Sequence, residues 1–82
     1  MVGRFGGEEF VVILPETKLD TAVNIAERIR KAIERSDFCG SKVTISGGVK
    51  EYNNEDVATL IQKADKNLYM AKETGRNKII YK

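Results

Sequence analysis

The first ten residues hold the side chains best suited to binding a nucleotide or a metal ion. Gly6 and Gly7 permit positive φ values and leave the backbone open to close approach by a ligand. Glu8 and Glu9 follow directly. Neighbouring side chains of a regular strand point to opposite faces, but at a hairpin tip either carboxylate could reach a hard cation such as Mg²⁺. An ordinary tight turn followed by solvated glutamates accounts for the same residues, because Gly-Gly hairpins are common.

Two cations near the other end of the chain form a second candidate site. Lys72 and Arg76 lie four residues apart around the predicted end of a helix. The helix dipole alone favours cations at such a position. Arg76 follows Gly75, however, where the chain turns back toward the predicted sheet, and two cations there could clamp a polyphosphate. The residues by themselves leave both interpretations open.

The composition limits the chemistry that such sites could perform. The 82 residues can form one domain at most. One cysteine and no histidine exclude an internal disulfide, a zinc site with several soft ligands, and histidine acid–base catalysis. A formal net charge of +2 is too slight to favour nucleic acid as a partner, and the apolar run at residues 10–14 is too short to cross a membrane. A site must therefore use carboxylates, lysine, arginine and backbone.

The hydrophobic pattern predicts alternating strands and helices that would position these groups. The expected elements are a strand at 10–14, a helix at 20–35 with Asp20 as N-cap, a strand at 43–49, a helix between Asn54 (the expected cap) and Gly75, and a strand at 77–81. This β-α-β-α-β order favours a layered α/β domain with right-handed crossovers. Residues 1–5 are too short to form much of a preceding strand. The chain therefore has the pattern of the second half of a larger domain.

Three motifs together resemble one protein family. Residues 6–10, Gly-Gly-Glu-Glu-Phe, resemble the G-G-[D/E]-E-F signature of the GGDEF domain, the catalytic domain of diguanylate cyclases. Residues 64–77, ADKNLYMAKETGRN, are similar to that family's A-D-x-A-L-Y-x-A-K-x-x-G-R-N, and residues 43–49, VTISGGV, to its v-T-i-S-x-G-v strand. The resemblance covers essentially the whole chain, in the family's order and spacing. It implies a ferredoxin-like, palm-type sheet.

The resemblance also implies an activity and a role for each candidate residue. Two GTP molecules would condense to cyclic di-GMP and two pyrophosphates across a two-fold dimer, with Mg²⁺ or Mn²⁺ and in the bacterial cytoplasm. Glu8 would coordinate the metal, and Glu9 would bind metal or activate the 3′-hydroxyl. The backbone of Gly6 and Gly7 would lie against the nucleotide, while Lys72 and Arg76 would hold its terminal phosphates. These roles need no histidine, since phosphoryl transfer depends mainly on positioning and charge neutralisation.

Several parts of the family's site have no counterpart in this sequence. In the family, a preceding half supplies a second metal-binding aspartate, the asparagine and aspartate that read guanine, and the inhibitory R-x-x-D product site. Residues 1–82 are therefore expected to be the C-terminal portion of one incomplete domain. Arg28 resembles an arginine that helps to bind product in some members, although an ordinary solvated arginine on a helix is the favoured explanation.

Two functions of different classes follow. The first is a diguanylate cyclase fragment that is inactive alone, because half of the metal site and all base recognition are absent. The alternative is a non-catalytic module of the same fold that senses a nucleotide or dimerises. A third hypothesis, a generic nucleotide-binding α/β domain, has less support, because the sequence contains neither a P-loop nor a G-x-G-x-x-G motif.

The expected truncation has a consequence for self-association. The missing first strand should lie between strands 10–14 and 43–49, and both edges of strand 10–14 would then be open. We therefore expect a homodimer or a higher oligomer, formed by strand pairing or domain swapping. No nucleic-acid or membrane partner is expected.

Overall fold

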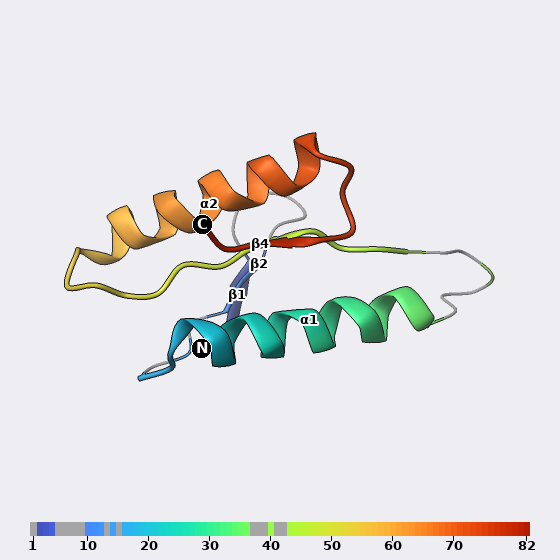
Figure 1. Cartoon of the computed structure of the whole chain (residues 1–82), viewed down its shortest axis with the longest axis horizontal. Helices are drawn as coiled ribbons and strands as arrows, with labels where there is room; N and C mark the ends of the chain where they lie inside the picture. The colour runs from blue at the N-terminus through green and yellow to red at the C-terminus, as the bar shows by residue number, and fades with distance from the viewer. Residues whose placement is uncertain (1, 5–9, 13, 15, 37–39, 41–42) are drawn as a thin grey trace.

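The computed structural model of the chain describes residues 2–4, 10–12, 14, 16–36, 40 and 43–82. Its elements are β1 (Val2–Arg4), β2 (Phe10–Val12), α1 (Leu19–Arg35), β3 (Gly47–Gly48), α2 (Val57–Glu73) and β4 (Ile79–Ile80). Figure 1 shows α1 and α2 on opposite sides of the β3–β4 pair, and both helices contact that pair. The predicted α/β class with two helices is confirmed.

The strands β1 and β2 form an antiparallel pair in which Val2 faces Val12 and Arg4 faces Phe10. The expectation that both edges of strand 10–14 would be open is therefore wrong, because β1 occupies one of them. Three residues preceding the signature are enough to form this ladder. The expected hairpin tip at Gly6 and Gly7 lies outside the described residues.

The strands β3 and β4 are parallel and are joined by α2, as the predicted β-α-β order requires. Gly47 pairs with Ile79 and Gly48 with Ile80, and the backbone N–H of Val49 donates to the Ile80 carbonyl at 2.9 Å. Both strands are shorter than the predicted ranges 43–49 and 77–81. A strand extends only as far as its ladder partner, and β4 pairs with two residues of β3.

Helix α1 begins one residue before the predicted Asp20 cap. Its N-cap is Lys18, which makes no side-chain capping bond. The N–H of Leu19 instead donates to Oε1 of Glu51 at 2.9 Å, a residue 32 positions away. The prediction of Asp20 as N-cap is wrong because a tertiary contact satisfies the helix terminus. No residue of α1 is buried.

Helix α2 is capped by Asp56 rather than by the predicted Asn54. The Asp56 carboxylate accepts a hydrogen bond from the Thr59 N–H at 2.8 Å. Hydrogen bonds from Thr59 lower the pKa of Asp56 below its ordinary value, which keeps the cap ionised. Asn54 lies in the turn before the helix with a φ of 62°. Asparagine and aspartate are about equally favourable N-caps, so residue type alone could not decide between Asn54 and Asp56.

The closest packing in the described chain is between α2 and β3. A Cβ on Gly48 would lie 2.1 Å from the Ala64 carbonyl oxygen and 2.3 Å from the Leu68 nitrogen. Glycine is therefore required where the helix backbone crosses the strand. Ala71 on α2 and Ile79 on β4 are the buried apolar residues of the described chain. In the part of the chain that the structure describes, no helix is long and apolar enough to cross a membrane.

Candidate functional site

The C-terminal end of α2 holds the predicted cationic pair. Lys72 lies in the last turn, and the helix ends at a Schellman-type turn. Gly75 there has a φ of 121°, and the N–H of Arg76 donates to the Ala71 carbonyl at 2.9 Å. The prediction that Gly75 terminates the helix is confirmed. Arg76 follows the turn directly and is exposed, so its guanidinium is accessible to a ligand in solution.

A third cation joins this end of the helix. The Nζ of Lys78 donates to the Thr74 carbonyl and lies beside Gly75. Carbonyls of the last helical turn lack helical partners, and the dipole makes this end partially negative. Lys78 therefore caps the helix, whereas Arg76 makes its Schellman bond through its backbone.

A polar cluster fixes the chain immediately after Arg76. The backbone N–H of Asn77 donates to Oγ of Ser46 at 3.0 Å. Its side-chain Oδ1 accepts from Nη1 of Arg30 at 3.0 Å, and its Nδ2 donates to Oε2 of Glu34 at 2.6 Å. Asn77 thus connects the start of the last strand segment to α1 through both ends of its amide.

Arg30 is held in this cluster by its own helix. Its guanidinium donates to Glu27 through Nη2 at 2.8 Å and through Nε, and it lies 3.7 Å from a carboxylate oxygen of Glu34. The hydrogen bond from Arg30 lowers the pKa of Glu27, and the bond to Glu27 raises the pKa of Arg30. Glu27 and Arg30 both stay ionised at neutral pH, so Oδ1 of Asn77 meets a cation.

The product-site candidate Arg28 does not belong to this cluster. It is exposed and lies two positions from Arg30, which is about 200° around the helix. Arg28 therefore projects from nearly the opposite side of α1. The structure does not bring it toward Lys72 and Arg76.

The acidic half of the predicted site, Glu8 and Glu9, lies outside the described residues, as do Gly6 and Gly7. The antiparallel β1–β2 pair brackets this segment, since Arg4 faces Phe10. Among the residues that the structure describes, no group of three or more carboxylate, cysteine or histidine side chains could hold a metal ion.

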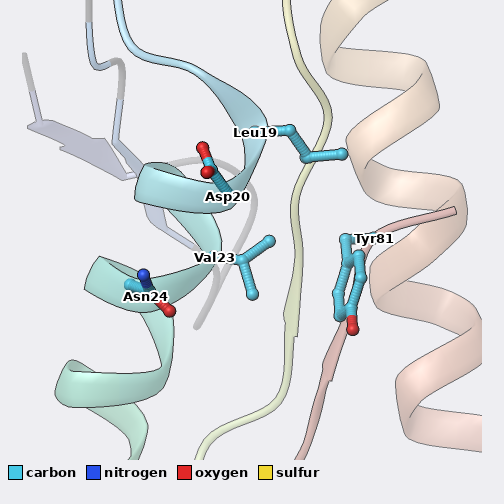
Figure 2. A pocket seen from close by; sticks show the side chains of 5 residues that line it. All are labelled: Leu19, Asp20, Val23, Asn24 and Tyr81. Carbon is cyan, nitrogen blue, oxygen red and sulfur yellow. The ribbon is translucent and has the colours of Figure 1, made fainter.

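A separate apolar depression of about 290 Å³ lies between the start of α1 and the C-terminal segment. Figure 2 shows Leu19 and Val23 pointing from α1 toward Tyr81, and Asp20 and Asn24 of the same helix complete the lining. Tyr81 follows β4 whereas Arg76 precedes it. The depression is thus at the opposite end of the strand from the cationic pair, and it contains none of the predicted site residues.

Comparison with known proteins decides the family. The profile described as "Diguanylate cyclase, GGDEF domain" matches residues 1–78. The chain belongs to the GGDEF family. Its fold agrees with the active GGEEF domain of a diguanylate cyclase from Vibrio cholerae, with a TM-score of 0.90 and 33% identity over 98% of this chain. Diguanylate cyclase SiaD from Pseudomonas aeruginosa, solved in complex with its activator SiaC, gives a TM-score of 0.85 and 32% identity over all of this chain.

Curated diguanylate cyclases are also similar to this chain in sequence. Diguanylate cyclase A of Treponema denticola is 45% identical over 93% of this GGDEF chain, and diguanylate cyclase DgcM of Escherichia coli K12 is 43% identical over 98% of it. The matches span 22% and 20% of those two proteins. The chain likewise covers 54% of the Vibrio cholerae domain and 34% of SiaD.

Sequence reasoning missed the cluster around Asn77. The residue was part of the G-R-N motif at 75–77 but received no role. A signal for its partners was present, because Glu27, Arg30 and Glu34 have the i, i+3 and i, i+4 spacing of ion pairs on one helix face. The contact across 47 positions between Arg30 and Asn77 could not be read from local spacing.

Proposed function

We propose that this chain is the C-terminal portion of a cytoplasmic diguanylate cyclase domain that converts two GTP into cyclic di-GMP and two pyrophosphates. Membership of the GGDEF family and the fold likeness to an active GGEEF domain support this. In the reaction, the 3′-hydroxyl of each GTP attacks the α-phosphate of the other, and pyrophosphate leaves. Two domains must face each other, each holding one nucleotide.

Lys72 and Arg76 hold the terminal phosphates in this proposal. The exposure of Arg76 beside the helix end supports its role, because it makes the guanidinium available to a ligand. A helix C-terminus repels anions, so a phosphate bound there needs cationic side chains. A guanidinium can donate two parallel hydrogen bonds to one phosphate, whereas an ammonium acts as a point charge.

The signature segment supplies the remaining contacts of the proposed site. The backbone at Gly6 and Gly7 lies against the nucleotide. Glu8 and Glu9 would hold Mg²⁺ or Mn²⁺, whose chemistry is to neutralise charge on the phosphates and to lower the pKa of the attacking hydroxyl. Carboxylate oxygens are the ligands that these hard cations prefer.

We expect the 82-residue chain alone to lack cyclase activity, since it covers only 54% of the related solved domain. The guanine-reading residues and the second metal ligand that the family resemblance implies have no match in this sequence. Incubating the purified chain with GTP and Mg²⁺ and assaying product by chromatography tests this expectation. Formation of cyclic di-GMP would contradict it.

Binding tests the phosphate role directly. We expect Arg76→Ala to weaken binding of magnesium-GTP on the order of tenfold, since a hydrogen bond to a charged group is lost, and to leave GMP binding unchanged. Lys72→Ala should act in the same direction. Arg35→Ala, which removes an exposed arginine from the end of α1, is the matched control. Equal loss of GTP and GMP binding would refute the terminal-phosphate assignment. Stronger binding of cyclic di-GMP than of GTP would favour the sensor function.

Self-association is the second part of the proposal. In the described part of the chain both sheets have two strands, so each strand has an edge without a ladder partner. Open edges pair readily with another copy. Light scattering at high micromolar concentration should therefore detect dimers or larger species. A stable monomer at that concentration would contradict this proposal.

A further inference from the structure

Arg76 and Asn77 have a backbone conformation that L-residues rarely adopt. Their φ values are 61° and 49°, and they directly follow Gly75 at 121°. Glycine adopts such values freely and asparagine tolerates them, whereas a long side chain is disfavoured there. Such a conformation persists only where surrounding contacts determine it. The bond from the Arg76 N–H to Ala71 fixes one side of this segment.

Asn77 fixes the other side of Arg76 through three hydrogen bonds. Its N–H donates to Ser46, its Oδ1 accepts from Arg30, and its Nδ2 donates to Glu34. The amide cannot rotate by half a turn without placing its donor against the guanidinium and its acceptor against the carboxylate. Charge on α1 therefore determines the orientation of Asn77.

The partners of Asn77 are themselves fixed on α1. Arg30 is only 14% exposed and is bound by Glu27 on the same helix. Helix α1 contacts β4, the strand that follows Asn77. The segment carrying Arg76 is thus anchored on one side to α2 and on the other to α1.

We propose that Asn77, oriented by Arg30 and Glu34, is a positioning residue that holds Arg76 where its guanidinium meets the terminal phosphates of the nucleotide. The proposal depends on the phosphate role of Arg76 given above. It makes α1 a part of the phosphate site, although α1 supplies no ligand to the phosphate. Asn77 touches no substrate and acts only through its neighbour.

A double-mutant cycle on the 82-residue chain tests this role. The variants are Asn77→Ala, Arg76→Ala and the double substitution, titrated with magnesium-GTP and with GMP. We expect each single substitution to weaken GTP binding on the order of tenfold, the double to weaken it no further than Arg76→Ala, and GMP binding to stay unchanged. A merely structural loss would weaken GMP binding as well as GTP binding, so unchanged GMP binding separates the two roles. Asn24→Ala, an exposed asparagine of α1, is the matched control.

Three outcomes would overturn the proposal. Unchanged GTP binding by Asn77→Ala, or additive losses in the double variant, overturns the positioning role while the phosphate role of Arg76 stands. Unchanged binding by Arg76→Ala overturns both. If Asn77→Ala fails to fold by circular dichroism, Asn77→Gly replaces it, because glycine keeps the left-handed backbone without the amide. For Asn77→Gly we expect the same loss of GTP binding and the same non-additivity with Arg76→Ala. Additive losses would again overturn the positioning role of Asn77.

Discussion

The two helices lie against the same pair of strands but are attached to it in different ways. Helix α2 packs backbone to backbone on Gly48 and buries Ala71 completely. Helix α1 buries none of its residues, and Ile29 on its apolar face stays 44% exposed. Helix α1 is held instead by hydrogen bonds that it donates, from the Leu19 N–H to Glu51 and from the Arg30 guanidinium to Asn77.

This difference determines how each helix can contribute to a site. Contact through a glycine tolerates almost no displacement, because interiors pack densely and backbone atoms cannot move aside. Contact through polar side chains is directional, but water can replace either partner, so such a contact opens more easily. Helix α2, which carries Lys72, is therefore the more rigidly packed of the two, while α1 is joined through Asn77 to the segment that follows Arg76. We expect α1 to open locally with a lower free energy than α2.

The largest expected effect comes from filling the space at Gly48. In Gly48→Ala the new methyl group would meet backbone atoms of Ala64 and Leu68, which no rotamer change can relieve. We expect a loss of about 3 kcal/mol or more in the free energy of unfolding, measured by urea titration with circular dichroism. The matched control is Gly47→Ala, whose methyl group would meet only the terminal carbon of the Ile79 side chain. Equal effects of both substitutions would show that helix–strand contact does not control stability.

The next effect concerns the buried amide of Asn67 on α2. Its Nδ2 donates to the Val49 carbonyl at 2.9 Å and to the Lys82 carbonyl at 3.3 Å, and the residue is 5% exposed. Asn67→Ala leaves these acceptors without their donor, so we expect a loss of about 1–3 kcal/mol in the free energy of unfolding. The family motif quoted above has alanine here, so the fold should persist. Lys66→Ala, at an exposed neighbouring position, should change little.

The contacts of α2 and the two helix caps also show what the sequence could and could not predict. The helices, the α/β class and the helix end at Gly75 were predictable because hydrophobic period and turn chemistry are local. The sequence suggested that residues 47 and 48 lie in a strand, but not that α2 touches Gly48, because that contact joins distant segments. The caps at Asp20 and Asn54 were predicted wrongly, because nearby polar residues compete for the same N–H groups and a distant Glu51 can replace them.

The positions of some candidate site residues were also predictable, because they belong to local sequence motifs. Motif spacing identified Lys72 and Arg76, and the structure places both at the end of α2. The roles of Lys72, Arg76, Glu8 and Glu9 all stay predictions. The left-handed backbone at Arg76 and the contact between Asn77 and α1 could not be predicted, because no periodicity in either segment records them.

A smaller effect tests the polar attachment of α1. Arg30→Ala removes the hydrogen bond to Asn77 and the ion pair with Glu27. We expect amide hydrogen exchange in α1 to accelerate on the order of fivefold while exchange in α2 stays unchanged. The control is Arg28→Ala, which removes an exposed arginine from nearly the opposite side of the same helix. Equal acceleration in both helices would mean that α1 and α2 open as one unit.

The smallest expected effect is the pH dependence of that attachment. The hydrogen bond from Arg30 holds the pKa of Glu27 below its ordinary value of 4.5. A carboxylate whose pKa is lowered by folding stabilises the folded state above its unfolded pKa, and this contribution disappears as the pH falls through the lowered pKa. The difference in thermal midpoint between the wild-type chain and Glu27→Gln should therefore be constant above about pH 5 and shrink below about pH 4.5.

The size of this effect is limited by solvent. The Glu27 side chain is 32% exposed, so water and salt screen its attraction to Arg30, and 1 M NaCl should reduce the difference further. The variant Asp56→Asn measures the contribution of the α2 cap separately, since asparagine also caps a helix but carries no charge to titrate. A Glu27→Gln difference that stays constant down to pH 3 would show that Glu27 acts through packing. The charged attachment that distinguishes α1 from α2 would then have to lie in the Arg30–Glu34 pair, where Glu34→Gln repeats the measurement.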